Sequence, residues 1–171
     1  MNSEGYHVER NFAFITSRDR NIAVFPKSTN FNITLPDDYN DVVSVELTAG
    51  TVPNLDGVVN EPYLLLSIKE FNHIKMSNGN DYFSVLAIHK GQSDLFFNLD
   101  RSSAAIMPRK FYSPLQRLTS ITLELLKSDG KPLTFGANSN IDAVNQVSFT
   151  FEIKTLSKNR IEFDKDFRDV F

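Results

Sequence analysis

The sequence contains no cysteine and no tryptophan, and only seven of its 171 residues are glycine. Without cysteine there is no disulfide, no thiolate nucleophile and no zinc–thiolate site. The chain also has no Gly-rich phosphate loop and no Gly-x-Ser-x-Gly nucleophile elbow. The common sequence signatures of nucleotide-binding enzymes and serine hydrolases are therefore missing, and we expect a protein that is not an enzyme.

Positive charge and long apolar runs are also scarce. Lys and Arg number 18 against 21 Asp and Glu, which gives a net charge of −3 and a pI of about 5.6. Nucleic-acid binding requires concentrated positive charge, so we expect no nucleic-acid partner. Apolar runs such as 63–66 and 104–107 are far shorter than the roughly 20 residues of a membrane-spanning helix. The polar segment 1–10 lacks the apolar centre of a signal peptide. We expect no direct membrane insertion.

What the sequence does contain is the two-residue alternation of apolar and polar side chains that is typical of half-buried strands. It is clearest in the segments 43–49, 120–125 and 146–155. The segment 63–69 begins apolar on both faces, which indicates burial between a sheet and a second layer, such as a neighbouring subunit. Further strands are expected near 12–17, 31–35, 83–89, 95–99 and 105–111.

Turn residues separate these segments. Proline falls between the expected strands, and Asn78-Gly79 and Asp129-Gly130 indicate tight turns. About eight to ten short strands with such breaks predict an all-β domain, built as a sandwich, a barrel or a jelly roll. We expect this domain to span 11–156, after an N-terminal arm at 1–10 and before a tail at 157–171.

The tail differs in character from the rest of the chain. It is charged and places Phe163, Phe167 and Phe171 at four-residue steps. One interpretation is a short helix packed on its own domain, and the other is an arm that docks its phenylalanines on a partner.

Candidate ligands for a metal are few. The three histidines, His7, His73 and His89, are far apart in the sequence and form no His-x-His pair. The carboxylates of Asp37, Asp38 and Asp41 could hold Ca²⁺, but their spacing does not match an EF-hand loop. A solvated turn with local capping is the favoured interpretation, and we predict no cofactor or metal.

The charged turn Arg18-Asp19-Arg20 follows the first expected strand. Its arginines could contact an acidic neighbour, or they could stiffen the turn through a pair with Asp19. An exposed ion pair stabilises by less than about 1 kcal/mol, so stability alone does not explain the turn. Phenylalanine is abundant, at 15 residues, and aromatic side chains often anchor subunit contacts.

An ordered series of motifs resembles one known family. The motifs are Phe-Ile-Thr-Ser-Arg-Asp-Arg-Asn at 14–21, Asn-Phe-Asn-Ile-Thr-Leu-Pro at 30–36, a long strand at 42–53 ending in Val-Pro, Pro-Tyr-Leu-Leu-Leu-Ser-Ile at 62–68, a late hairpin at 113–136, and Phe-Thr-Phe-Glu-Ile at 149–153. In this order they resemble the penton proteins of large icosahedral double-stranded DNA viruses.

The resemblance covers most of 12–155 and implies a single jelly roll of two antiparallel sheets. It implies a virion protein, made and assembled in the host cytoplasm, that forms a homopentamer at each five-fold vertex. The implied partners are other copies of itself, the major capsid protein and minor capsid proteins. The family has no catalytic residues to carry over. The assembly-contact candidates are Arg18, Asp19, Arg20, Phe163, Phe167 and Phe171.

Two other functions stay open at this point. The same fold could serve as a minor capsid or cement protein away from the five-fold axis. It could also be a carbohydrate-binding jelly roll, although the chain lacks tryptophan, which is the preferred platform for stacking on sugars.

Overall fold

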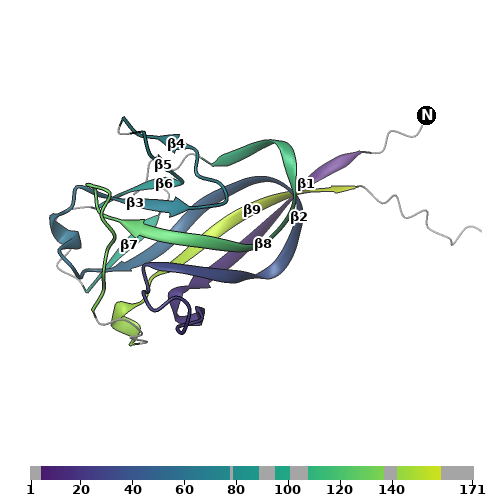
Figure 1. Cartoon of the computed structure of the whole chain (residues 1–171). Helices are drawn as coiled ribbons and strands as arrows, with labels where there is room; N and C mark the ends of the chain where they lie inside the picture. The colour runs from purple at the N-terminus through teal and green to yellow at the C-terminus, as the bar shows by residue number, and fades with distance from the viewer. Residues whose placement is uncertain (1–4, 78, 89–94, 101–107, 137–141, 159–171) are drawn as a thin grey trace, which may run out of the picture.

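The structure is a computed structural model that describes residues 5–77, 79–88, 95–100, 108–136 and 142–158 (Figure 1). Their secondary structure consists of strands and short 3-10 turns, which confirms the all-β prediction. No helix in this part of the chain is long and apolar enough to cross a membrane. The strands are β1 (Tyr6–Thr16), β2 (Asn30–Pro53), β3 (Tyr63–Ile68), β4 (Ile74–Lys75), β5 (Asp81–Tyr82), β6 (Ser84–Ala87), β7 (Phe96–Asp100), β8 (Arg109–Leu126) and β9 (Ser148–Lys158), and the turns are η1 (Ser17–Asp19), η2 (Val58–Asn60) and η3 (Ala143–Asn145).

Strand β2 belongs to both layers of the fold. Its first part, 30–40, pairs with β8, and its second part, 42–51, pairs with β9. One layer has the order β1-β9-β2-β7, and the other has the order β2-β8-β3-β6. All of these pairings are antiparallel. Two four-stranded layers with this order form a jelly roll, in agreement with the sequence.

The bend that carries β2 between the layers lies at register shifts. The pairing with β8 shifts between Thr34 and Tyr39 and again between Val42 and Ser44. Asp41 takes a left-handed backbone with a φ of 51°. The sequence predicted two strands here with a turn between them. The structure instead continues as one bent strand, because β-bulges can turn a strand without ending its ladder.

Two prolines lie in the interior of strands, and a third, Pro53, ends β2. Pro36 falls in the first register shift of β2, and Pro114 falls in the stretch of β8 opposite the second shift, between the partners of Val42 and Ser44. Proline has no backbone N–H to donate, so a position outside the ladder tolerates it. The end of the expected strand 105–111 and the expected strand 120–125 are both parts of the long strand β8, while 105–107 lie outside the described residues.

The hydrophobic core lies between the two layers. The alternating residues of β9 and β8 point inward, and Phe149, Leu123 and Leu125 are fully buried. Phe83, in the connection between β5 and β6, meets Phe151 of β9 with ring centroids 6.0 Å apart. The inward faces predicted from alternation at 120–125 and 146–155 are therefore confirmed.

A second, smaller cluster covers the other face of β3. Leu65 is buried there with Tyr82 of β5 and Leu126 of β8, and Met76 packs against them. The sequence left open what covers the second face of this strand. The short β4–β5 sheet of the same chain contributes to that cover, so no neighbouring subunit is needed at Leu65.

Candidate functional site

The Arg18-Asp19-Arg20 turn has an internal and an external part. Arg20 is only 4% exposed, and its guanidinium donates to the carbonyls of Ser17 (2.6 Å), Phe25 (2.8 Å) and Pro26 (2.9 Å). It also donates to Oε1 of Gln146 at 2.8 Å. Burial lowers the pKa of this guanidinium from its usual value. Arg20 therefore holds the turn together from inside. Of the two roles considered for the arginines of this turn, Arg20 has the structural one, through backbone carbonyls and Gln146.

Arg18 and Asp19 lie on the surface of the same turn. Both are exposed, and the Arg18 backbone N–H donates to Oγ1 of Thr16 at 3.3 Å, which caps η1. Of the three charged turn residues, these two are the ones a partner can reach. A contact role for Arg18 and Asp19 stays a prediction. Phe163, Phe167 and Phe171 lie outside the described residues.

The exposed face of β1 is apolar. Tyr6, Val8, Phe12 and Phe14 are between 53% and 63% exposed. Because they lie at even positions of one strand, they share one face, which we call the β1 stripe. The opposite face is inward and carries the smaller apolar side chains of Ala13 and Ile15. The strand thus presents larger apolar groups to solvent than it gives to the core.

The sequence contained a signal for the β1 stripe. Apolar side chains alternate from Tyr6 to Phe14, interrupted only by Arg10. We expected a polar arm at 1–10 and a short strand at 12–17, but the strand begins at Tyr6. In the described part of the chain, β1 pairs with β9 alone, so its other edge is open. Figure 1 shows β1 and β9 extending together beyond the rest of the body.

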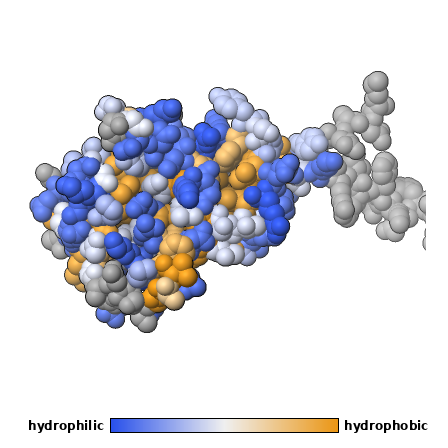
Figure 2. All heavy atoms as spheres, viewed as in Figure 1, coloured by the Kyte–Doolittle hydropathy of each residue, from blue (hydrophilic) through white to orange (hydrophobic). Residues whose placement is uncertain are grey.

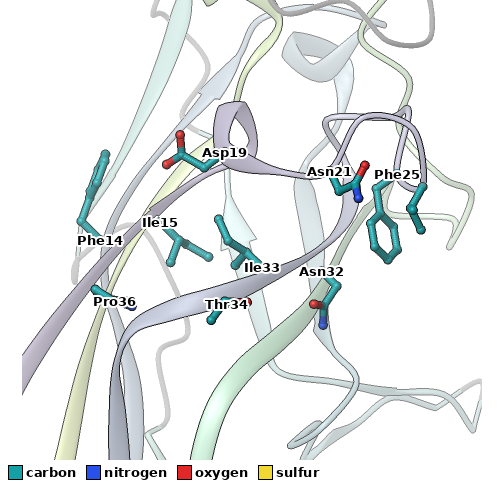
Figure 3. Close-up of a pocket in the computed structure, with 10 residues that line it drawn as sticks. Phe14, Ile15, Asp19, Asn21, Phe25, Asn32, Ile33, Thr34 and Pro36 are labelled. Atoms are coloured by element: carbon teal, nitrogen blue, oxygen red, sulfur yellow. The ribbon is translucent and has the colours of Figure 1, made fainter.

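A cavity of about 540 Å³ lies between the end of β1, the segment after η1 and the start of β2. We call the side of the sandwich formed by β1 and the start of β2 its open side. Figure 3 shows Ile15 and Ile33 projecting toward each other from the two strands, while Phe14 points away. Asp19 and amide side chains such as Asn32 line its rim. The lining combines apolar walls with amides and a single carboxylate.

A second cavity of about 380 Å³ lies farther along the same open side. Glu9 and Asn11 of β1 face Asp37, Asp38 and Tyr39 of β2 across it. Burial and the nearby charge of Asp37 raise the pKa of Tyr39. This cavity is acidic, and because residues 155–157 of β9 also line it, it lies against the β1–β9 pair.

Asp37, Asp38 and Asp41, which we considered as Ca²⁺ ligands and interpreted as a solvated turn, lie at the bend of β2. No group of three or more His, Asp or Glu side chains among the described residues is placed to hold a metal ion. Asp38 forms an ion pair with Arg117 of β8. Asp41 lies at the bend of β2. These carboxylates belong to the bulged turn of a strand.

Two of the three histidines fall in the part of the chain that the structure describes, His7 on β1 and His73 just before β4. Nε2 of His7 lies 3.0 Å from Oε1 of Glu9 on the exposed strand β1. His73 packs edge-on against Phe83, with ring centroids 5.8 Å apart. His89 lies outside the described residues.

The surface seen in Figure 2 is mostly hydrophilic. Apolar residues reach it below the bend of β8 and at the lower end of the molecule. The second of these places lies on the side of the segment after η1, in which Val24 is 62% exposed.

The fold and these surfaces define an all-β jelly-roll protein with an open, partly apolar flank. Comparison of the chain with models of protein families and with curated proteins found no match.

Proposed function

We propose that this protein is a structural subunit that assembles with copies of itself into the vertex, or penton, of an icosahedral virus capsid. The β1 stripe is the observation that carries the proposal. Monomeric proteins rarely expose several large apolar side chains next to one another on their surface. Such apolar patches mark interaction sites. The virion, and the cytoplasm of the host as the place of assembly, belong to the same proposal.

The jelly roll supports this function because of its shape. A closed ring requires a heterologous contact, in which one flank of a subunit meets a different surface of the next. The open side formed by β1 and the start of β2 supplies such a flank, with two cavities and the β1 stripe. The motifs that resemble penton proteins lie on the same elements, because 14–21 spans β1 and η1 and 30–36 opens β2.

The aromatic content of the β1 stripe gives it a large part of the area that a stable contact needs. An aromatic side chain buries about 150–250 Å² when fully covered. Three aromatics and a valine, each roughly half exposed, therefore leave several hundred Å² of apolar surface to cover. A standard interface buries about 800 Å² on each partner, so the β1 stripe would supply a large part of one subunit's share.

Mass measurement of the full chain tests the proposal. We expect a pentamer in native mass spectrometry and five-fold rings in electron micrographs, and density for this chain at the vertex of a virion reconstruction. A chain that stays monomeric at high concentration and is absent from the vertex contradicts the proposal. Density away from the five-fold axis would identify a minor capsid or cement protein instead.

A further inference from the structure

We propose that the C-terminal segment 163–171 of a second copy of this chain adds as an antiparallel strand to the open edge of β1 and sets its phenylalanines beside the apolar side chains of the β1 stripe. This inference rests on the proposed self-assembly and names the surface and segment that carry it. It begins from the two unsatisfied features of β1, which are an edge without a described partner strand and an apolar outer face. An exposed edge of this kind is a ready template for an added strand.

The sequence of the tail has the pattern of a half-buried strand. Ile161, Phe163, Phe167 and Phe171 all fall at odd positions, and charged residues fill most of the even ones. Residues four apart lie on the same face of a strand, so the spacing of the phenylalanines fits a strand as well as a helix. One face of such a strand would carry large apolar side chains, as the β1 stripe does.

The positions of the charged residues indicate the register in which the segment 163–171 pairs with β1. The β1 stripe is interrupted only by Arg10, and the apolar face of the tail is interrupted by Lys165 and Asp169. Antiparallel pairing of Arg10 with Asp169 places Val8 opposite Phe171 and Phe12 opposite Phe167. Opposite charges and apolar pairs at facing positions are the arrangements that stabilise a sheet. Arg10 already has Glu152 at 3.6 Å from its Nε, and its exposed side chain can face a second carboxylate.

The same register gives a second match on the other side of the added strand. It places Arg168 opposite Asn11, beside the cavity lined by Glu9, Asp37 and Asp38. A guanidinium is a suitable group for an acidic cavity because it donates to several carboxylate oxygens. The match on the outer face and the match at the cavity use different residues, so each supports the register separately.

The end of β9 favours a tail from a second copy. Lys158 pairs with Tyr6 at the end of the β1–β9 ribbon that extends beyond the body (Figure 1). Lys158, the last residue that the structure describes, therefore lies at the far end of this ribbon, away from the body of its own sandwich. The paired length, from Val8 to Thr16, is about 26 Å at the usual rise of a strand. The segment 163–171 matches this length residue for residue.

Cross-linking of full-length chains tests the proposal, because the protein has no cysteine of its own. Phe12→Cys and Phe167→Cys variants are purified separately, one with an affinity tag, then mixed and oxidised. We expect a mixed disulfide dimer as the main product. Phe12→Cys mixed with Phe163→Cys is the matched control, since Phe163 lies on the same face but four residues out of register. We expect about tenfold less of that product, because bridged Cα atoms must lie within about 7 Å.

A charge variant tests the cavity match. Arg168→Glu in the Phe167→Cys chain should lower the yield of the mixed dimer about tenfold, since a like charge would enter the acidic cavity. Lys165→Glu makes the same change of charge on the other face and should lower the yield far less. Equal yields from the two variants overturn the assigned register.

The remaining outcomes also decide the question. A disulfide that forms only within the Phe12→Cys/Phe167→Cys double variant, as a monomer, overturns the exchange between copies. Predominant self-linking of Phe12→Cys shows that β1 pairs with β1 and also overturns it. Pentamers without the mixed disulfide leave the proposed function standing while this inference fails. The mixed disulfide without five-fold rings supports this inference and contradicts the proposed function.

Discussion

Nη1 of Arg20 donates a 2.8 Å hydrogen bond to Oε1 of Gln146, which lies 126 positions later in the sequence. The same Oε1 accepts from the hydroxyl of Ser17 at 2.8 Å, and Oγ of Ser17 accepts from the backbone N–H of Val147 at 3.0 Å. The turn that ends β1 is therefore fastened to the segment that enters β9. The β1 edge is held in place from its buried end.

Replacement of Arg20 by methionine should lower the free energy of unfolding by about 3 kcal/mol, because the carbonyls of Ser17, Phe25 and Pro26 and the side chain of Gln146 would lose the donor that Arg20 supplies. Urea denaturation measures the change. Arg18→Met serves as control, since Arg18 is exposed, and should change the free energy by less than about 0.5 kcal/mol. Equal effects of the two variants would contradict the internal role of Arg20.

Gly50 should not tolerate alanine. It pairs with Phe149 across β2 and β9, and a Cβ at Gly50 would lie 2.7 Å from Cδ1 of that buried ring. We expect Gly50→Ala to cost about 1–3 kcal/mol of unfolding free energy through overpacking. In a Phe149→Leu background, the smaller side chain should relieve much of this cost. A double-mutant cycle from thermal or urea unfolding measures the coupling, and additive effects would count against the contact.

Substitution in the β1 stripe should separate assembly from folding. Phe12→Ser with Phe14→Ser removes two exposed aromatic rings, so the unfolding free energy should change by less than about 1 kcal/mol. The proposed oligomer should dissociate, and light scattering of the full chain measures this. The matched control is Tyr112→Ser, which removes a fully exposed aromatic ring on β8. A loss of the oligomer in that control but not in the β1 variant would contradict the role of the β1 stripe.

The turn between β8 and Leu133 has a measurable pH response. Nζ of Lys131 lies 2.7 Å from Oδ2 of Asp129, and this hydrogen bond is the main reason that the pKa of Asp129 lies below its usual value. The carboxylate form is therefore favoured by folding. Its small stabilisation is present at neutral pH and is lost as the pH falls through the lowered pKa.

The direction of that shift can be measured directly. In an NMR titration, Lys131→Met should raise the pKa of Asp129 toward the value of a free aspartate. Lys127→Met is the control, because Lys127 makes the weakest contribution to the shift and should change the pKa less. A pKa of Asp129 that does not respond to Lys131→Met would contradict the ion pair.

Much of the fold could be predicted from short-range pattern. Alternation at 120–125 and 146–155 identified the inward faces correctly, because a strand places alternate side chains on opposite faces. The Asp129-Gly130 turn was also identified, and Gly130 takes a φ of 83° there. The start of β1 was missed because the charged residues among 1–10 gave this segment the character of a polar arm. Its alternating apolar side chains face solvent rather than the core.

The sequence by itself determined the all-β class, the two-faced strands and several of the turns. These depend on local geometry, in which the two-residue period of a strand and the backbone preferences of glycine act over a few positions. Only the tertiary structure decided that Arg20 is internal, that β2 serves both layers, and that the apolar face of β1 points to solvent. Those outcomes depend on which distant strands pair. The local alternation of a strand does not by itself specify which of its two faces meets the core.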